Sequence, residues 1–217
     1  MAAAATHPAP SYSRDRWRRR GSMLQDALLV CISAVFLYAQ ARRVFADGAL
    51  TSAPFAVEQA LLVWMFLTRR RSLATSTRPF DWIVATGGGW LPFFLQPQGG
   101  LPAGAEMAGT AIQVAGLTCT IICFSYLGRS FGIVAANRGL KTHGPYGIVR
   151  HPIYFSHSIT MTGFLIANFH PLNVAMLAVI TACQLLRIRA EERVLTDSGD
   201  YAAYKKAVPW RLLPGVF

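Results

Sequence analysis

Long apolar runs separated by short polar segments constrain the fold of this chain more than any other feature. We expect these runs to be membrane-spanning helices, because a bilayer needs about 20 apolar residues per helix. Charged residues are only 14% of the chain, whereas a soluble domain carries about a quarter. The six runs are residues 23–41, 55–68, 80–96, 105–127, 153–167 and 172–187. The sequence therefore predicts an all-α integral membrane protein with about six hydrophobic helical segments.

Two runs carry additional signals. Gly87, Gly88 and Gly89 lie in the middle of the third run, where small residues permit close packing against another helix. The last two runs are separated only by residues 168–171, Asn-Phe-His-Pro. Such a short polar joint predicts that the last two helices form a hairpin.

The basic residues predict the orientation in the membrane. The net charge of +11 could indicate nucleic-acid binding, but the Lys and Arg residues cluster beside apolar runs, so we expect no nucleic-acid partner. With the N-terminus in the cytoplasm, 19 of the 21 Lys and Arg fall on cytoplasmic segments, the exceptions being Arg42 and Arg43. Both termini are then cytoplasmic, and residues 128–152 and 187–217 share one face.

The chain divides into three parts. Residues 1–22 are rich in Ala, Pro and Ser and then basic, which predicts a disordered tail; residues 23–127 hold the first four helices. Residues 128–217 hold the polar segment, the hairpin and the cytoplasmic tail, and form the predicted catalytic region. The Ala-, Arg- and Gly-rich composition favours a bacterial inner membrane, and the oligomeric state stays open.

The chemistry is concentrated in residues 137–154, which contain one Lys, two Arg, two His and two Tyr. Gly144-Pro145 predicts a turn, and Pro152 suits the first position of a helix. His143, His151 and His157 are spaced eight and six apart, unlike a helical metal pair, and the four Cys lie in apolar runs. We therefore expect hydrogen-bonding histidines and no metal.

Arg187, Glu191 and Glu192 follow the last apolar run, with Arg187 and Glu191 four residues apart on one helical face. They could form a solvated salt bridge at the membrane surface. Alternatively they face residues 138–154 as catalytic candidates, Arg187 holding an anionic group and Glu191 a hydroxyl, an amine or a cation. Glu192 or His151 would then accept a proton, if the reaction requires one.

Taken in order, these elements resemble one enzyme family. Gly144-Pro145-Tyr146, Arg150-His151-Pro152-Ile153-Tyr154, Arg187 with Glu191-Glu192, Tyr201-x-x-Tyr204 and Val208-Pro209 are similar to the motifs of isoprenylcysteine carboxyl methyltransferases. Membrane phospholipid N-methyltransferases are related and share the His-Pro-x-Tyr and Glu-Glu elements. The resemblance covers about residues 124–214.

The resemblance implies an integral membrane methyltransferase that binds S-adenosylmethionine at its cytoplasmic face. Arg187 is implied to bind the substrate, a lipophilic acceptor such as the carboxylate of an isoprenylcysteine-like or other lipid-linked molecule. The implied cofactor-binding residues are Arg138, Gly139, Leu140, Lys141, Tyr146, His151, Pro152, Ile153, Tyr154 and Glu191. For Arg138 and Lys141, the contacts could come from the side chain or from the backbone.

Three alternatives stay open at this point. The acceptor could be a phospholipid amine or a phenolic lipid instead of a carboxylate. The C-terminal part also looks similar to NADPH-dependent membrane reductases of the sterol-reductase type. Finally, the protein could be a non-catalytic membrane subunit.

Overall fold

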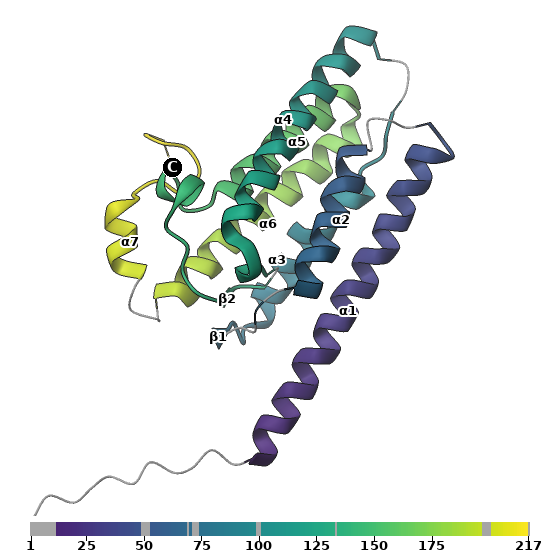
Figure 1. Ribbon diagram of the computed structural model, residues 1–217. Coiled ribbons are helices and arrows are strands. Elements are labelled where there is room, and N and C mark those ends of the chain that lie inside the picture. Colours follow the sequence, from purple (N-terminus) through teal and green to yellow (C-terminus); the bar gives the residue numbers. More distant parts are fainter. Residues whose placement is uncertain are drawn as a thin grey trace, which may run out of the picture.

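The computed structural model describes residues 12–48, 53–68, 70, 74–98, 101–132, 134–196 and 201–216. These residues form a helical protein with one pair of two-residue antiparallel strands (Figure 1). The helices are α1 (Tyr12–Phe45), α2 (Ala53–Thr68), α3 (Pro79–Trp90), α4 (Ala103–Leu127), α5 (Pro152–Ala167), α6 (Pro171–Thr196) and α7 (Tyr201–Ala207). The strands are β1 (Ala74–Thr75) and β2 (Ala136–Asn137), and the 3-10 turns are η2 (Leu91–Phe94), η3 (Gly128–Ser130) and η4 (Gly144–Gly147). The predicted all-α class and the α5–α6 hairpin are confirmed.

The number of membrane-spanning helices differs from the prediction. Among the described residues, three helices are long and apolar enough to cross a bilayer, namely those at Ala27–Phe45, Ala103–Ser130 and Pro171–Thr196. The six predicted spans are therefore not confirmed. The third apolar run is divided, because α3 ends at Trp90 and Pro92 lies in the following turn η2, where its missing N–H cannot continue an α-helix. Helix α3 has 12 residues and is about 18 Å long, well short of a bilayer core.

Residues 12–22, the second half of the predicted disordered tail, are helical in the structure. Helix α1 already begins at Tyr12 and runs for 34 residues, well beyond the apolar run itself (Figure 1). The basic residues between Tyr12 and Ser22 thus extend a helix, which arginine supports as a good helix former. Residues 1–11 lie outside the described part of the chain.

Helices α4 and α5 pack against each other backbone to backbone (Figure 1). A Cβ atom added at Gly163 would lie 2.6 Å from the backbone N of Gln113, and one at Gly109 would lie 2.6 Å from the backbone N of Ala167. Farther along, Thr120 donates a 2.8 Å hydrogen bond to the hydroxyl of Ser156. Small residues at these positions bring two helices together as they do in membrane interiors.

Helix α6 carries the predicted tail residues, because it continues without a break to Thr196. Helix α3 packs against it through its glycines, since a Cβ atom on Gly87 would lie 3.1 Å from the Sγ of Cys183. One turn from its end, α6 is bound to α3 by Arg193, whose guanidinium lies 2.7 Å from a carboxylate oxygen of Asp81. The close packing predicted for the glycine run is therefore present.

The C-terminal segment folds back beside the loop that connects α4 to α5 (Figure 1). Tyr201, Tyr204 and Val208 form a small buried cluster to which Leu140 of the loop and Leu195 of α6 contribute. Helix α7 was not among the predicted helices, because its seven residues carry no apolar run. It covers the loop that holds most of the predicted cofactor-binding residues.

Candidate active site

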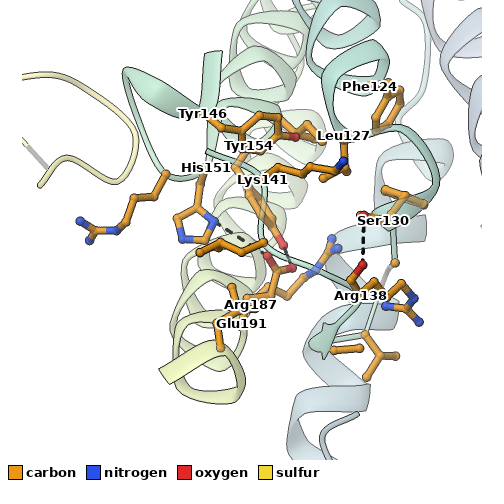
Figure 2. Close-up of a pocket in the computed structure, with 18 of the residues that line it drawn as sticks. Phe124, Leu127, Ser130, Arg138, Lys141, Tyr146, His151, Tyr154, Arg187 and Glu191 are labelled. Atoms are coloured by element: carbon orange, nitrogen blue, oxygen red, sulfur yellow. Dashed lines mark hydrogen bonds and ion pairs between the residues drawn. The ribbon is translucent and has the colours of Figure 1, made fainter. Parts of the chain in front are cut away.

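One cavity brings most of the predicted site residues together (Figure 2). It lies between the α4–α5 loop, the hairpin helices α5 and α6, and the inner faces of α2 and α4. The predicted residues that line it are Arg138, Gly139, Leu140, Lys141, Tyr146, His151, Ile153, Tyr154, Arg187 and Glu191. Pro152 and Glu192, the other two predicted residues, do not line it.

The loop side of the cavity is fixed by hydrogen bonds between side chains and the backbone. Ser130 donates a 3.1 Å hydrogen bond to the carbonyl of Arg138 (Figure 2). The amide of Gly139 donates to the Asn137 side chain at 3.0 Å. Gly139 has a φ of 96°, which favours glycine at this turn. These contacts fix the conformation of the loop at the residues following β2.

The Arg138 side chain is anchored against the loop. Its Nε donates to the carbonyl of Arg70 at 3.2 Å, and its guanidinium lies so close to Gly132 that a Cβ there would be 2.1 Å from the nearest nitrogen. Burial lowers the pKa of the Arg138 guanidinium, and the negative charge of Glu191 opposes this shift. Arg138 is thus a fixed positive charge at the cavity wall.

Helices α5 and α6 meet across the cavity through Tyr154 and Glu191. The Tyr154 hydroxyl donates a short hydrogen bond to the Glu191 carboxylate (Figure 2). The Nδ1 of His151 lies 3.8 Å from the other carboxylate oxygen of Glu191. The carboxylate is thereby held in one place while it still lines the cavity.

Arg187 lies one helical turn before Glu191 and is buried, with 9% of its surface exposed. Its guanidinium carbon stands 5.2 Å from the centre of the Tyr154 ring, a cation–π contact. Gly88 of α3 makes room for it, because a Cβ atom at that position would lie 3.0 Å from the Cδ of Arg187. The pairing of Arg187 and Glu191 at one cavity agrees with the sharper of the two predictions for them.

Glu192 is enclosed by basic side chains. Its Oε1 accepts from the Nε of Arg150 at 2.9 Å and lies 3.3 Å from His151 Nε2, and its Oε2 accepts two hydrogen bonds from Arg211 at 2.9 and 3.1 Å. These partners occupy both oxygens, and the residue does not line the cavity. The arrangement favours an anchoring role over the proton-acceptor role that the sequence predicted for Glu192.

Arg150 belongs to the quoted motifs but was not among the predicted site residues, although it lines the cavity. Its NH1 donates to the carbonyls of Val208 and Pro209 at 2.8 and 2.6 Å, and its backbone amide donates to the carbonyl of Trp210 at 2.9 Å. The C-terminal segment is therefore bound to the residue directly before His151. This contact explains why the Val-Pro element accompanies the His-Pro-x-Tyr element in the sequence.

Tyr204 of α7 and Tyr146 of the turn η4 lie together on the loop side of the cavity. Tyr204 donates a 2.7 Å hydrogen bond to the carbonyl of Tyr146 and so fixes the turn η4. Burial raises the pKa of Tyr204 to about 12 and, with the nearby Cys123 and Glu191, raises that of Tyr146 as well. Both phenols are therefore neutral hydrogen-bonding groups at physiological pH.

Two residues at the inner end of the cavity were not among the predicted site residues. Glu58 of α2 and His157 of α5 both line it, and the His157 Nδ1 lies 2.8 Å from a carboxylate oxygen of Glu58. A signal for them existed in the sequence, because an ionisable residue within an apolar run is itself evidence for a functional site. Among the described residues, no three His, Cys, Asp or Glu side chains are grouped as metal ligands.

Comparison with known proteins identifies a family whose model matches part of the chain. No curated protein matches the chain significantly. The model of the phospholipid methyltransferase family matches residues 104–199, which include α4, the loop, α5 and α6. Nothing in these findings supports the reductase alternative. The resemblance predicted from the motifs is confirmed: residues 104–199 match the phospholipid methyltransferase family of membrane methyltransferases, which includes the isoprenylcysteine carboxyl methyltransferases.

Proposed function

We propose that this protein transfers a methyl group from S-adenosylmethionine to a lipophilic acceptor that reaches the site from the membrane. The observation that supports this proposal most directly is the composition of the cavity. Some of its lining is polar, with Lys141, His151 and Glu191, and some is apolar, with Leu62, Phe124 and Leu127. A water-borne cofactor suits the first environment and an apolar molecule the second.

The residues present fit S-adenosylmethionine. The cofactor carries a cationic sulfonium and ammonium, ribose hydroxyls and a carboxylate. Glu191, fixed by Tyr154, suits the hydroxyls or the ammonium, and Arg138 and Lys141 suit the carboxylate. The buried hydroxyl of Tyr146 has no hydrogen-bond partner among the described residues, so it is available to a ligand.

When bound, the cofactor supplies an electrophilic methyl group on sulfur. The protein then has to hold the acceptor atom close to that methyl and in line with it. Arg187 is suited to orienting the acceptor, because it lies one turn farther into the apolar part of α6 than Glu191. We infer that Glu191 serves the cofactor and that Arg187 serves the acceptor.

The experiment that tests this function has two arms. Isothermal titration calorimetry of the purified protein with S-adenosylmethionine and with NADPH identifies the cofactor, and we expect binding of the first only. Incubation with methyl-labelled S-adenosylmethionine and a lipid extract, followed by mass spectrometry, identifies the acceptor. Binding of NADPH without S-adenosylmethionine would overturn the proposal, and so would cofactor binding without labelled lipid.

A further inference from the structure

We propose that Glu58 and His157 form a proton-accepting pair at the inner end of the cavity, so that the natural acceptor is a phenol or an amine that loses a proton on methylation. This inference rests on the proposed methyltransferase function and deepens it. It favours a protic acceptor over the isoprenylcysteine-like carboxylate that the resemblance first suggested. It also assigns roles to two residues that the motif set does not include.

The contact with Glu58 orients the His157 ring. Its Nδ1 lies 2.8 Å from the Glu58 carboxylate, and both side chains are well buried, at 14% and 8% exposure. With Glu58 ionised and the imidazole neutral, the carboxylate can only accept, so Nδ1 carries the hydrogen and Nε2 carries the lone pair. A carboxylate, an imidazole and a free lone pair in this order are the arrangement that makes histidine a general base.

The Nε2 of His157 accepts no hydrogen bond in the described part of the chain. Its Nε2 is buried without a hydrogen-bond partner among the described residues, as is the second carboxylate oxygen of Glu58. Buried polar atoms are almost always paired, because leaving them unpaired destabilises the protein. Since the His157 ring also lines the cavity, a ligand there that donates a hydrogen would satisfy the Nε2.

The position of His157 along α5 agrees with this role. It follows Tyr154 by three residues, which places it about 4.5 Å farther toward the hairpin turn and on the same face. Helix α6 runs antiparallel, so Gln184, which also lines the cavity, lies a similar distance beyond Arg187. The cavity thus contains three successive levels, with Glu191 outermost, then Arg187 with Tyr154, and His157 with Glu58 innermost.

These groups account for every bond and proton in the proposed methyl transfer. The acceptor oxygen or nitrogen forms a bond to the methyl carbon as the bond from that carbon to sulfur breaks, and the electron pair stays on sulfur. The proton of the acceptor passes to Nε2 of His157, and Glu58 stabilises the resulting imidazolium. A carboxylate acceptor has no proton to give, and Glu58 would repel its negative charge.

The alternative is that the pair only joins α2 to α5. A purely structural contact would affect the stability of the protein and the methylation of every acceptor alike. It would not change the ionisation of a molecule bound in the cavity. This difference allows a test that does not depend on the cofactor.

The test uses 4-nitrophenol bearing a nonyl chain, whose phenolate form absorbs visible light. The probe is added to full-length protein in detergent without cofactor, and its apparent pKa is compared with that in detergent alone. We expect the wild-type protein to lower the apparent pKa of the bound probe by at least about one unit, equivalent to tenfold in the ionisation equilibrium. His157→Gln should abolish this shift, and Glu58→Gln should reduce it.

His170→Gln is the matched control, because His170 is exposed and lies at the hairpin turn, outside the residues that line the cavity. This variant should lower the apparent pKa of the bound probe as much as the wild type does. Three results would overturn the assignment of this pair. The wild-type protein could leave the apparent pKa of the probe unchanged, all variants could lower it equally, or the probe could fail to bind.

A second measurement separates this inference from the proposed function. Each variant is titrated with S-adenosylmethionine and then assayed with a long-chain phenol and with a prenylated thioether carboxylate. We expect wild-type cofactor affinity throughout, with kcat for the phenol at least about tenfold lower in His157→Gln and restored in part by imidazole added to His157→Gly. Equal activity of wild type and His157→Gln on the phenol would refute the base, whereas lack of cofactor binding by the wild type would refute the methyltransferase.

Discussion

The hydroxyl of Tyr154 donates a hydrogen bond to the carboxylate of Glu191 and so ties together the two helices of the hairpin at the cavity. Removal of either partner should weaken cofactor binding while the helices still pack. Glu191→Ala should raise the Kd of S-adenosylmethionine by roughly ten- to a hundredfold, since a hydrogen bond to a charged group contributes about 1.5–3 kcal/mol. Tyr154→Phe should have a smaller effect, since it leaves the carboxylate in place. Calorimetry would measure both, and unchanged affinity in both variants would exclude Glu191 from the cofactor site.

Arg187→Lys should separate acceptor handling from cofactor binding. The substitution keeps the charge but loses the planar fork of donors that lies over the Tyr154 ring. We expect the Kd of S-adenosylmethionine to stay within about twofold and kcat/KM for the acceptor to fall at least about tenfold, or about 1.4 kcal/mol. Steady-state kinetics with the identified acceptor would check this. A parallel loss of cofactor affinity would mean that Arg187 supports the outer part of the cavity instead.

Glu192→Gln tests the reassignment of this residue from proton acceptor to anchor. The change leaves the buried Arg150 with a neutral partner, so we expect a loss of stability of about 3 kcal/mol and earlier proteolysis of the C-terminal segment. The turnover of the folded fraction should stay within about twofold, since Glu192 does not line the cavity. Glu106→Gln in the first turn of α4 serves as the control. Wild-type stability together with lost turnover would restore the catalytic role.

Gly163→Ala should destabilise the protein by about 1–3 kcal/mol, because the added methyl group would overlap backbone atoms of α4. Gly104→Ala is the matched control, since nothing lies within 4 Å of a Cβ atom at that position and alanine favours the helix. The melting temperature of both variants in detergent would be compared with that of the wild type. Equal melting temperatures for the two would contradict the close α4–α5 contact.

The orientation in the membrane can be tested by labelling single cysteines in a variant that lacks the four natural ones. Lys205 is exposed on α7, and His143 is exposed in the α4–α5 loop. We expect His143→Cys and Lys205→Cys to react with a membrane-impermeant reagent from the cytoplasmic side, and Phe169→Cys at the hairpin turn to react from the other side. Reaction of the first two from opposite sides would contradict a shared cytoplasmic site.

The sequence predicted which residues of the loop and of the hairpin come together better than it predicted the arrangement of the first helices. The apolar runs predicted the helices, and most of the site residues chosen from the ordered motifs line the cavity. The number of spans could not be read in the same way, because a 12-residue helix next to a proline turn and a true membrane span both appear as one apolar run. Contacts between segments far apart in the chain could not be predicted from the sequence either. Glu58 and His157 are 99 residues apart, and no local pattern pairs a carboxylate in one run with a histidine in another.

The sequence also could not show which of Glu191 and Glu192 faces the cavity. A carboxylate next to Glu191 reads as a second reactive group, but neighbouring residues on a helix point about 100° apart. One of the pair therefore faces the cavity, and the other faces Arg150 and Arg211. Only the packing of α7 and the C-terminal segment decides which residue takes which position.

The bonds from Arg150 to Val208, Pro209 and Trp210 also fix when the site can be finished during biosynthesis. A ribosome delivers residue 150 long before residue 208, so α4, α5 and α6 can enter the membrane while these carbonyls do not yet exist. A nascent chain that has just inserted its hairpin lacks both α7, which also lines the cavity, and the segment that anchors the residues before His151. The wall of the cavity beside His151 is thus completed only after the helices of the hairpin have been made.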